Sequence, residues 1–197
     1  MSRRLSLLLI LCSIFMLSCG NINTLQKEYD TRLFDAIKAA DSDAIVSALN
    51  QGANPNADTG NDGTALCTLI QQYKRSHNER KSRIELCTKE MLRFHADPER
   101  LHHGFTPLQI AAGQGSDVIV NHLIQYGADP SIETKSGLAP IWQAVHTNNY
   151  RVGAVLLRGG ANPNALNNDG LTPLQYLRNQ GRTKTRLMIL LRHYGGR

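Results

Sequence analysis

Three histidines are the residues of this chain whose types and spacing come nearest to a site for chemistry. His95, His102 and His103 fall within nine residues, and imidazole rings grouped in this way can hold a zinc ion. Zinc takes three or four convergent ligands, whereas two adjacent histidines at a turn point apart. We therefore expect no metal and interpret the three side chains as facing solvent or a partner.

The short motifs of common catalytic sites do not occur in the sequence. There is no G-x-S-x-G, no H-E-x-x-H and no G-x-x-x-x-G-K-[ST]. Gly113-Gln114-Gly115 is only part of a dinucleotide-binding fingerprint, and it follows a helical Ala-Ala pattern instead of a strand. The sequence therefore predicts neither an enzyme nor a bound cofactor.

Two cysteines in the body of the chain could react with each other. Cys67 and Cys87 are expected on the first and second helix of one helix pair. In an exported protein they could form a disulfide if their Cα atoms lie within about 7 Å. Alternatively, both are small core residues, because a free cysteine packs as a small hydrophobe. The sequence leaves the two alternatives open.

The N-terminal residues have the layout of an export signal. Arg3 and Arg4 precede a charge-free run over residues 5–17, which is too short to span a bilayer as a helix. The run ends in M-L-S-C-G, which resembles the lipobox of bacterial lipoproteins. The resemblance implies a signal peptide over residues 1–18 and a lipid anchor on Cys19, with ordinary cleavage at this point as the alternative.

The residue after the anchor cysteine bears on location. In lipoproteins of two-membrane bacteria an aspartate there favours the inner membrane, and this chain has Gly20 instead. By resemblance we expect an exported lipoprotein anchored in the outer membrane and facing the periplasm. Residues 19–29 would form a short polar tether between the membrane and the folded domain.

The net charge of the chain is modest but unevenly distributed. The chain has 22 basic and 16 acidic residues, a formal net charge of +6, which is too small to predict nucleic-acid binding. Residues 178–197 include six basic residues and no acid. A second basic cluster comprises Lys74, Arg75, Arg80, Lys81 and Arg83. Such clusters favour an acidic partner or anionic lipid headgroups.

A repeat organises the chain beyond the leader. Thr31, Thr64, Thr106, Ala139 and Thr172 occupy the same place in successive units, at spacings of 33, 42, 33 and 33 residues. The third unit begins with G-F-T-P-L-Q-I-A-A-G and ends with G-A-D-P, and two other units end with G-A-N-P-N. Repeats of this length indicate a stack in which each unit buries its apolar side against its neighbours.

These motifs resemble the ankyrin family. The resemblance covers about residues 30–197 and implies an all-α ankyrin-repeat solenoid of about five helix–turn–helix units, the last an atypical cap. The units lie near 30–61, 62–103, 104–136, 137–169 and 170–197. The second unit is ten residues longer than the others, and we expect its insertion around 73–82 to be a surface loop.

Capping signals within the units agree with helix pairs. The threonine or its neighbour is expected to cap each first helix, with proline in the first turn. Gly52, Gly127 and Gly160 are expected to end second helices in the left-handed conformation, and His95 takes that place in the second unit. We expect Trp142 to pack in the core.

The resemblance implies a scaffold that binds a protein partner through the concave face of its first helices and through its turn tips. The positions on the concave face are Asp35, Lys38, Gln71, Gln72, Ile110, Gln114, Gln143, His146, Thr147 and Tyr176. The positions at the tips are His102, His103, Lys135, Asn167 and Asn168. The partner itself is not identified by fold.

Three roles are compatible with an exported scaffold of this kind. It could inhibit, or give immunity against, an envelope enzyme or toxin. It could instead be an adaptor in envelope assembly, or it could bind the membrane surface through its basic patches. Nucleic acid is not expected as a partner.

Overall fold

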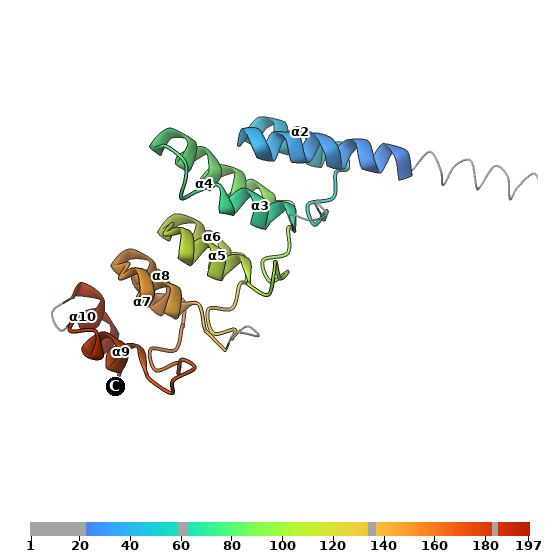
Figure 1. Cartoon of the computed structure of the whole chain (residues 1–197). Coiled ribbons are helices and arrows are strands. Elements are labelled where there is room, and N and C mark those ends of the chain that lie inside the picture. Colours follow the sequence, from blue (N-terminus) through green and yellow to red (C-terminus); the bar gives the residue numbers. More distant parts are fainter. Residues whose placement is uncertain (1–22, 59–62, 134–136, 183–184) are drawn as a thin grey trace, which may run out of the picture.

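Helix pairs stack side by side along one axis in the computed structural model of the chain (Figure 1). The structure describes residues 23–58, 63–133, 137–182 and 185–197. The proposed signal peptide, Cys19 and Lys135 lie outside these residues. Within them the chain is all-α, with two isolated β-bridges at the tips, which confirms the predicted solenoid.

Each unit contributes a first and a second helix. In the first unit a helix covers residues 23–39 and is followed by α2 (Ser42–Asn50). The later pairs are α3 (Ala65–Gln71) with α4 (Asn78–Arg93), α5 (Pro107–Gln114) with α6 (Asp117–Gln125), α7 (Ile141–Thr147) with α8 (Tyr150–Arg158), and α9 (Pro173–Asn179) with α10 (Arg186–His193).

The threonines begin the first helices as predicted in three units. The hydroxyls of Thr64, Thr106 and Thr172 each accept a hydrogen bond from the backbone N–H three residues later. At Thr106 and Thr172 a glutamine completes a capping box and proline occupies the first turn, where its missing N–H costs nothing. The α7 helix follows Pro140 and has no side-chain cap.

Left-handed residues end the second helices where the sequence predicts them. Gly52, Gly127 and Gly160 have φ of 104°, 97° and 101°, a conformation open to glycine at little cost. His95 adopts φ of 63° at the corresponding place in the second unit. The chain can therefore turn toward the tip even where the usual glycine is absent.

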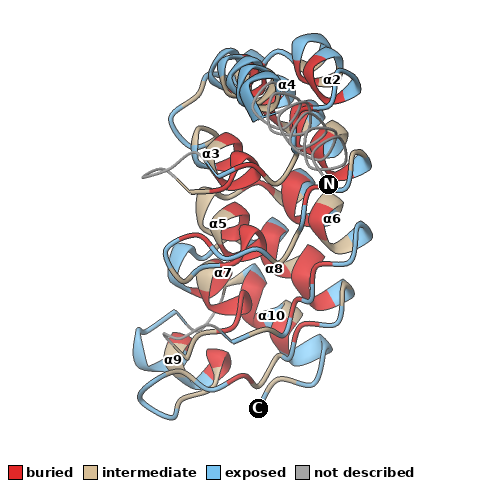
Figure 2. Cartoon of the chain, turned by 90° about the vertical axis from the view of Figure 1, so that its right-hand side faces the viewer, coloured by how far each residue is buried: buried red, intermediate tan, exposed pale blue. Residues whose placement is uncertain are grey.

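The core lies between two rows of helices (Figure 2). One row is α3, α5, α7 and α9, and the other is α4, α6, α8 and α10. Leu108, Ile119 and Trp142 are completely buried in this layer, and Trp142 donates its indole N–H to the carbonyl oxygen of Ala165 at 3.2 Å. Trp142 is therefore a core residue, as predicted.

Asparagines at the tips connect successive units. Asn56 donates its amide to the carbonyl oxygen of His95 at 3.1 Å and accepts from the N–H of Asp97 at 2.6 Å. Asn164 repeats this pair of bonds with Gly195 and Arg197, at 3.1 and 2.8 Å. The last asparagine of G-A-N-P-N thus fastens each of these tips to the next unit.

The predicted boundary between tether and domain is wrong in the structure. Residues 23–29 are helical and continuous with the first helix of the first unit. Thr31 consequently lies inside a helix, where its hydroxyl donates to the carbonyl oxygen of Lys27 at 2.7 Å instead of capping. Gln26 also donates to the carbonyl oxygen of Gly52 at 3.0 Å, so this segment packs onto the first unit.

The insertion is not only a surface loop. The α4 helix has sixteen residues, whereas α2, α6 and α8 have nine each. Most of the added length is therefore helical, and the remainder lengthens the connection over residues 72–77. A helix that begins earlier satisfies its own backbone groups, which a long irregular loop would leave to solvent.

Cys67 and Cys87 are free thiols in the structure, and both side chains are fully buried. Their placement fits the alternative in which they are small core residues. Burial raises the pKa of each thiol to about 11. Among the described residues, no helix is long and apolar enough to cross a membrane.

Candidate functional site: a groove on the face of the first helices

The first helices place equivalent residues in rows across the units. Thr68, Ile110, Gln143 and Tyr176 each stand four residues after the start position of their unit. The first helices stack side by side (Figure 1). Because these four residues occupy equivalent positions on them, we expect their side chains on one face of the solenoid. We call this surface the first-helix face, and it corresponds to the predicted concave face.

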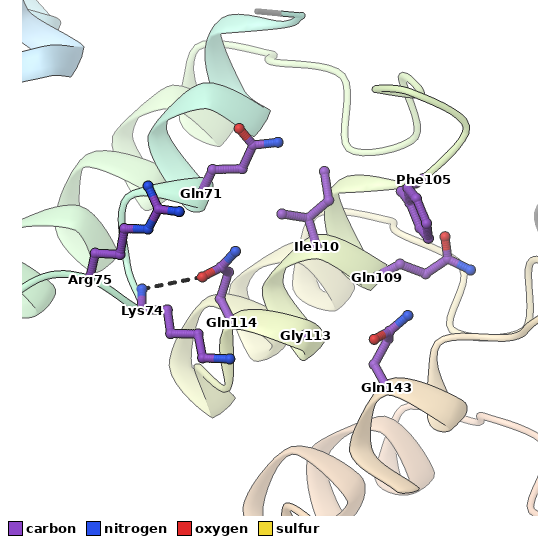
Figure 3. A pocket seen from close by; sticks show the side chains of 9 residues that line it. All are labelled: Gln71, Lys74, Arg75, Phe105, Gln109, Ile110, Gly113, Gln114 and Gln143. Carbon is purple, nitrogen blue, oxygen red and sulfur yellow. Dashed lines mark hydrogen bonds between the residues drawn. The ribbon is translucent and has the colours of Figure 1, made fainter. Parts of the chain in front are cut away.

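A groove of about 530 Å³ opens on this face between α3, α5 and α7 (Figure 3). Its lining residues are Gln71, Lys74, Arg75, Phe105, Gln109, Ile110, Gly113, Gln114 and Gln143. The predicted concave residues Gln71, Ile110, Gln114 and Gln143 therefore lie together. The structure also brings Lys74 and Arg75 of the basic cluster into the same site, which the sequence had not linked to it.

The floor of the groove is apolar at its centre. Ile110 is half-buried on α5, and the ring of Phe105 beside it is 40% exposed. Gly113 stands one turn further along α5 and has no side chain to fill the space. A Cβ built there would lie 3.3 Å from the side-chain oxygen of Gln143, so the groove depends on this glycine.

Amide side chains line the walls. Gln71 and Gln143 make no side-chain hydrogen bond to another described residue. Gln114 accepts a hydrogen bond through Oε1 from the backbone N–H of Lys74 at 3.3 Å (Figure 3). Gln109 has a structural role, because its buried amide donates to the carbonyl oxygen of Leu138 at 2.6 Å.

The bond from Lys74 to Gln114 positions the start of the insertion. It joins residues forty apart in the sequence and holds the connection after α3 against the end of α5. The side chains of Lys74 and Arg75 remain exposed at the rim of the groove. Two positive charges therefore stand beside an apolar floor.

Arg80, another basic residue of the insertion, makes its contacts inside the molecule. Arg80 donates to the carbonyl oxygens of Lys38 and Ala39, the latter at 3.2 Å, and to Oε1 of Gln72 at 2.6 Å. Carbonyl oxygens at a helix end have no partner within the helix, so this guanidinium caps the helix over 23–39. Arg80 is a structural residue of the insertion.

Lys81 and Tyr73 form a second contact within the insertion. The Lys81 ammonium lies 5.3 Å from the centre of the Tyr73 ring. The Tyr73 hydroxyl donates to Oε1 of Glu85 at 2.8 Å, and burial raises the pKa of Tyr73. Arg83 is exposed and does not line the groove.

A side hollow of about 480 Å³ continues from the groove. It shares Gln71 and Arg75 with the groove and includes Gln72, whose amide is already bonded to Arg80. The predicted pair Asp35 and Lys38 lies on the preceding helix, where the two side chains form an exposed ion pair at 3.6 Å. These two residues line neither hollow.

The remaining predicted concave residues lie nearer the C-terminal end. Rings of Trp142, His146 and Tyr176 form a cluster with centroids 5.5 to 5.7 Å apart. Burial lowers the pKa of His146, which favours its neutral form. The Thr147 hydroxyl donates to the carbonyl oxygen of Gln143 at 2.7 Å. The predicted residues His146, Thr147 and Tyr176 do not line the groove.

The tips depart from the prediction at His102. This side chain is 6% exposed, and a Cβ added to Gly63 would collide with its ring, so His102 packs between two tips. Reciprocal backbone bonds of 2.9 Å between His102 and Phe105 form a tight turn with His103 exposed at its end. The prediction that His102 faces solvent or a partner is therefore wrong, because the turn directs its side chain inward.

The other described tip residues are Asn167 and Asn168. Oδ1 of Asn167 accepts from the N–H groups of Asp169 and Leu171, at 3.0 and 2.9 Å, so this side chain holds its own turn. Asn168 is exposed. Within the part of the chain that the structure describes, no group of three histidine, cysteine or acidic side chains is placed to hold a metal.

Phe105, Gln109 and Gly113 line the groove. None of these three was predicted from the sequence as a site residue. Gly113 occupies the same position as Gln71 and His146 in the neighbouring units, so the repeat register could have identified it. Phe105 precedes the capping threonine and reaches the groove only because of the tight turn before it. Apart from its His-Gly pair, the sequence of that turn contains no residue pattern that predicts its conformation.

Comparisons with known proteins concern the repeats. A family model described as "Ankyrin repeats (3 copies)" matches residues 81–167. The chain is 28% identical over 160 residues to neurogenic locus notch homolog protein 1 of Danio rerio, covering 68% of this chain and 6% of the relative. It is 26% identical over 170 residues to the B-cell lymphoma 3 protein homolog of Mus musculus, covering 86% of this chain and 37% of the relative.

A third match is to an ADP-ribosylation factor GTPase-activating protein of Arabidopsis thaliana. The identity is 30% over 96 residues, which is 48% of this chain and 12% of the relative. In all three cases the chain spans well under half the length of the relative. The similarity is thus to a portion of each of these proteins.

Proposed function

Since this chain carries ankyrin repeats, which in general serve as non-catalytic scaffolds for protein binding, we propose that it is an exported, lipid-anchored scaffold whose groove holds one protein partner. The observation that carries the proposal is the convergence at the groove. Free amides, an apolar floor and two exposed cations from separate segments lie around one space. Polar groups around an apolar centre are the usual composition of a protein interface.

Export and lipid attachment are supported by the leader alone. The basic start, the charge-free run and the M-L-S-C-G sequence are what a lipoprotein signal requires. Cys19→Ala should abolish lipid attachment and leave an uncleaved or aberrantly cleaved precursor. An unchanged mature mass and normal membrane extraction in this variant would contradict the lipoprotein assignment. Because Gly20 follows the cysteine, we place the protein at the outer membrane, facing the periplasm.

The partner can be captured by cross-linking from the groove. A photo-reactive amino acid at Gln114 should give one cross-linked product in intact cells. The same amino acid at Leu86, which is 46% exposed on α4, is the matched control because it lies outside the groove. Products of equal yield from both positions would contradict the groove as the binding site.

Within this proposal we favour an inhibitor or immunity-type role against an envelope enzyme or toxin. A groove whose rim is extended by an insertion in one unit suits one dedicated partner more than a succession of partners. One stoichiometric enzyme or toxin among the cross-linked products would support this role. Several envelope-assembly proteins in its place would support the adaptor role.

The C-terminal helix offers a second candidate function, which is contact with a membrane surface. Ile189 on α10 is 64% exposed and shares its side of the helix with Arg186 and His193. An exposed apolar residue between basic ones suits an anionic lipid surface. Salt-sensitive binding of the unlipidated domain to anionic vesicles that is lost in Ile189→Asp would support this function, and binding unaffected by the substitution would refute it.

A further inference from the structure

We propose that the occupant of the groove is an acidic segment of the partner protein, an extended stretch in which an apolar side chain is flanked by aspartate or glutamate. This inference rests on the proposed function and specifies the partner of that same site. It follows from the sign of the charges around the groove, from the partners those charges have and from the shape of the floor.

The groove and the side hollow have no acidic residue in their lining. The segments that supply the groove are also free of acids, since neither aspartate nor glutamate occurs in 64–75, 105–116 or 138–149. The segment that supplies the side hollow contains one acid, the exposed Glu79, which does not line the hollow. The chain has 16 acidic residues in all, so their absence here is a segregation of charge and not a general shortage. Acids lie in other parts of the chain, as at Asp58 and Asp129 at the tips and Glu90 on α4.

The cations of this surface differ in how far they are already paired. Arg80 in the side hollow is bonded to carbonyl oxygens, whereas no ion pair involves Lys74 or Arg75 within the described residues. Two acids of neighbouring helices are engaged elsewhere: Asp35 pairs with Lys38, and Glu85 accepts from Tyr73. The charges at the rim are therefore available to a carboxylate from outside.

The floor of the groove is the part that would accommodate the apolar side chain of the partner segment. Ile110 and the exposed ring of Phe105 offer an apolar surface, and the missing side chain at Gly113 makes room for an inserted group. An apolar side chain placed there gains by leaving water. A carboxylate next to it, on the side of the insertion, then lies near Lys74 or Arg75 (Figure 3).

A strand of nucleic acid fits this surface less well than an acidic peptide. Nucleic acid needs a track of many cations along its phosphates, and an aromatic platform for its bases. The groove has two exposed cations at one end, with neutral amides along the rest of its walls. Amides such as Gln71 and Gln143 can instead bond the backbone of an extended peptide.

The test is a selection from a displayed library of random twelve-residue peptides, with the purified full chain in detergent as bait. Selected peptides are resynthesised with a fluorescent label, and their dissociation constants are measured by anisotropy at low and high salt. A single-stranded oligothymidine and, after dilution of the detergent below its critical micelle concentration, vesicles of anionic phospholipid serve as non-peptide polyanion probes.

Two variants address the two halves of the proposal. Lys74→Glu/Arg75→Glu reverses the free charges, and its matched control is Arg83→Glu/Lys89→Glu, which changes the net charge equally at exposed positions outside the groove. Gly113→Leu fills the groove. It should fold, because Gly113 is helical without a positive φ and the nearest obstacle is the flexible Gln143 amide.

The expected result is enrichment of peptides that combine acidic residues with an apolar one. Their binding should weaken about ten-fold in Lys74→Glu/Arg75→Glu at low salt, with a smaller difference at high salt. It should be lost in Gly113→Leu and unchanged in the control. Failure to enrich such peptides, or equal binding to the charge-reversed variant, would overturn the proposal.

The outcomes also separate this inference from the proposed function. Neutral or basic peptides that lose binding in Gly113→Leu would refute the acidic partner and leave the groove as a binding site. Peptides that bind Gly113→Leu as tightly as the unmodified chain would refute the groove itself. Equal affinity for oligothymidine or anionic vesicles, with the same response to charge reversal, would overturn the peptide in favour of a general polyanion site.

Discussion

The second and fourth units have the same plan but use it differently. The fourth unit joins α7 to α8 through Asn148 and Asn149 alone, whereas the second joins α3 to the sixteen-residue α4 through residues 72–77. Trp142 and Cys67 occupy equivalent positions of the repeat, three residues after the start of their units. The fourth unit thus has the larger buried side chain at this position, and the second unit has the larger exposed surface at one end.

The comparison shows where a repeat can be enlarged without loss of packing. The buried positions of α4, including Ile84 and Cys87, lie in the part of the helix that stacks on its neighbours. The added residues lie ahead of this part, next to the first-helix face. Doubling the length of a loop raises the free energy of loop closure by only about 0.6 kcal/mol, so a unit can gain surface there with little loss of stability.

The largest expected effect is at the core of the fourth unit. Trp142→Ala should lower the free energy of unfolding by about 3–5 kcal/mol, because it leaves a large cavity and frees the carbonyl oxygen of Ala165. Cys67→Ala at the equivalent position should cost about 1 kcal/mol. Urea unfolding curves measure both, and similar losses would contradict the difference drawn between the units.

The buried thiols of the second unit should make the stability depend on alkaline pH. Their pKa is raised to about 11 in the folded chain, so their contribution is full below about pH 9 and is lost as the pH rises through 11. Unfolding measured from pH 8 to 11 should show a loss of about 4 kcal/mol for the two thiols together, which Cys67→Ala/Cys87→Ala largely removes. A double variant with the same pH profile would refute this origin.

Arg80 should matter for the insertion more than its exposed neighbours do. Arg80→Ala removes the bonds to the end of the helix over 23–39 and to Gln72, and should cost about 1–2 kcal/mol of unfolding free energy. Arg83→Ala is the control and should change it by less than about 0.5 kcal/mol. Equal effects in urea unfolding would mean that Arg80 is another surface charge.

The smallest effect on stability is expected at the groove rim. Lys74→Glu/Arg75→Glu should change the unfolding free energy by less than about 0.5 kcal/mol, since both side chains are exposed and unpaired by acids. The same variant should bind its partner more slowly at low salt. A large loss of thermal stability would show that these cations, like Arg80, support the fold.

Much of the fold follows from local rules that the sequence displays. Thr106 with its proline predicts a helix start, and Gly127 predicts a helix end, because both act through backbone groups within a few residues. The helix over 23–39 did not follow from such rules. Thr31 resembles a cap in the repeat register, but in the structure the residues before it are also helical and pack against Gly52.

The candidate site was predicted only in pieces. The register of the repeat identified Gln71, Ile110, Gln114 and Gln143, since equivalent positions share a face when units stack. It also placed His102 at the surface, and there the tight turn and the neighbouring tip bury it. A short turn is decided by a few backbone angles that neighbouring units can shift.

By itself the sequence determined the repeat, its register and therefore which side chains of the helices are buried, because these depend on spacing along the chain. It could not assign different roles to five basic residues that lie within ten positions of one another. Only the tertiary structure separated them, by placing Arg80 on the carbonyl oxygens of the preceding unit and Lys74 against Gln114 of the next. These contacts join residues about forty apart, so they are set by how the units stack and not by local sequence.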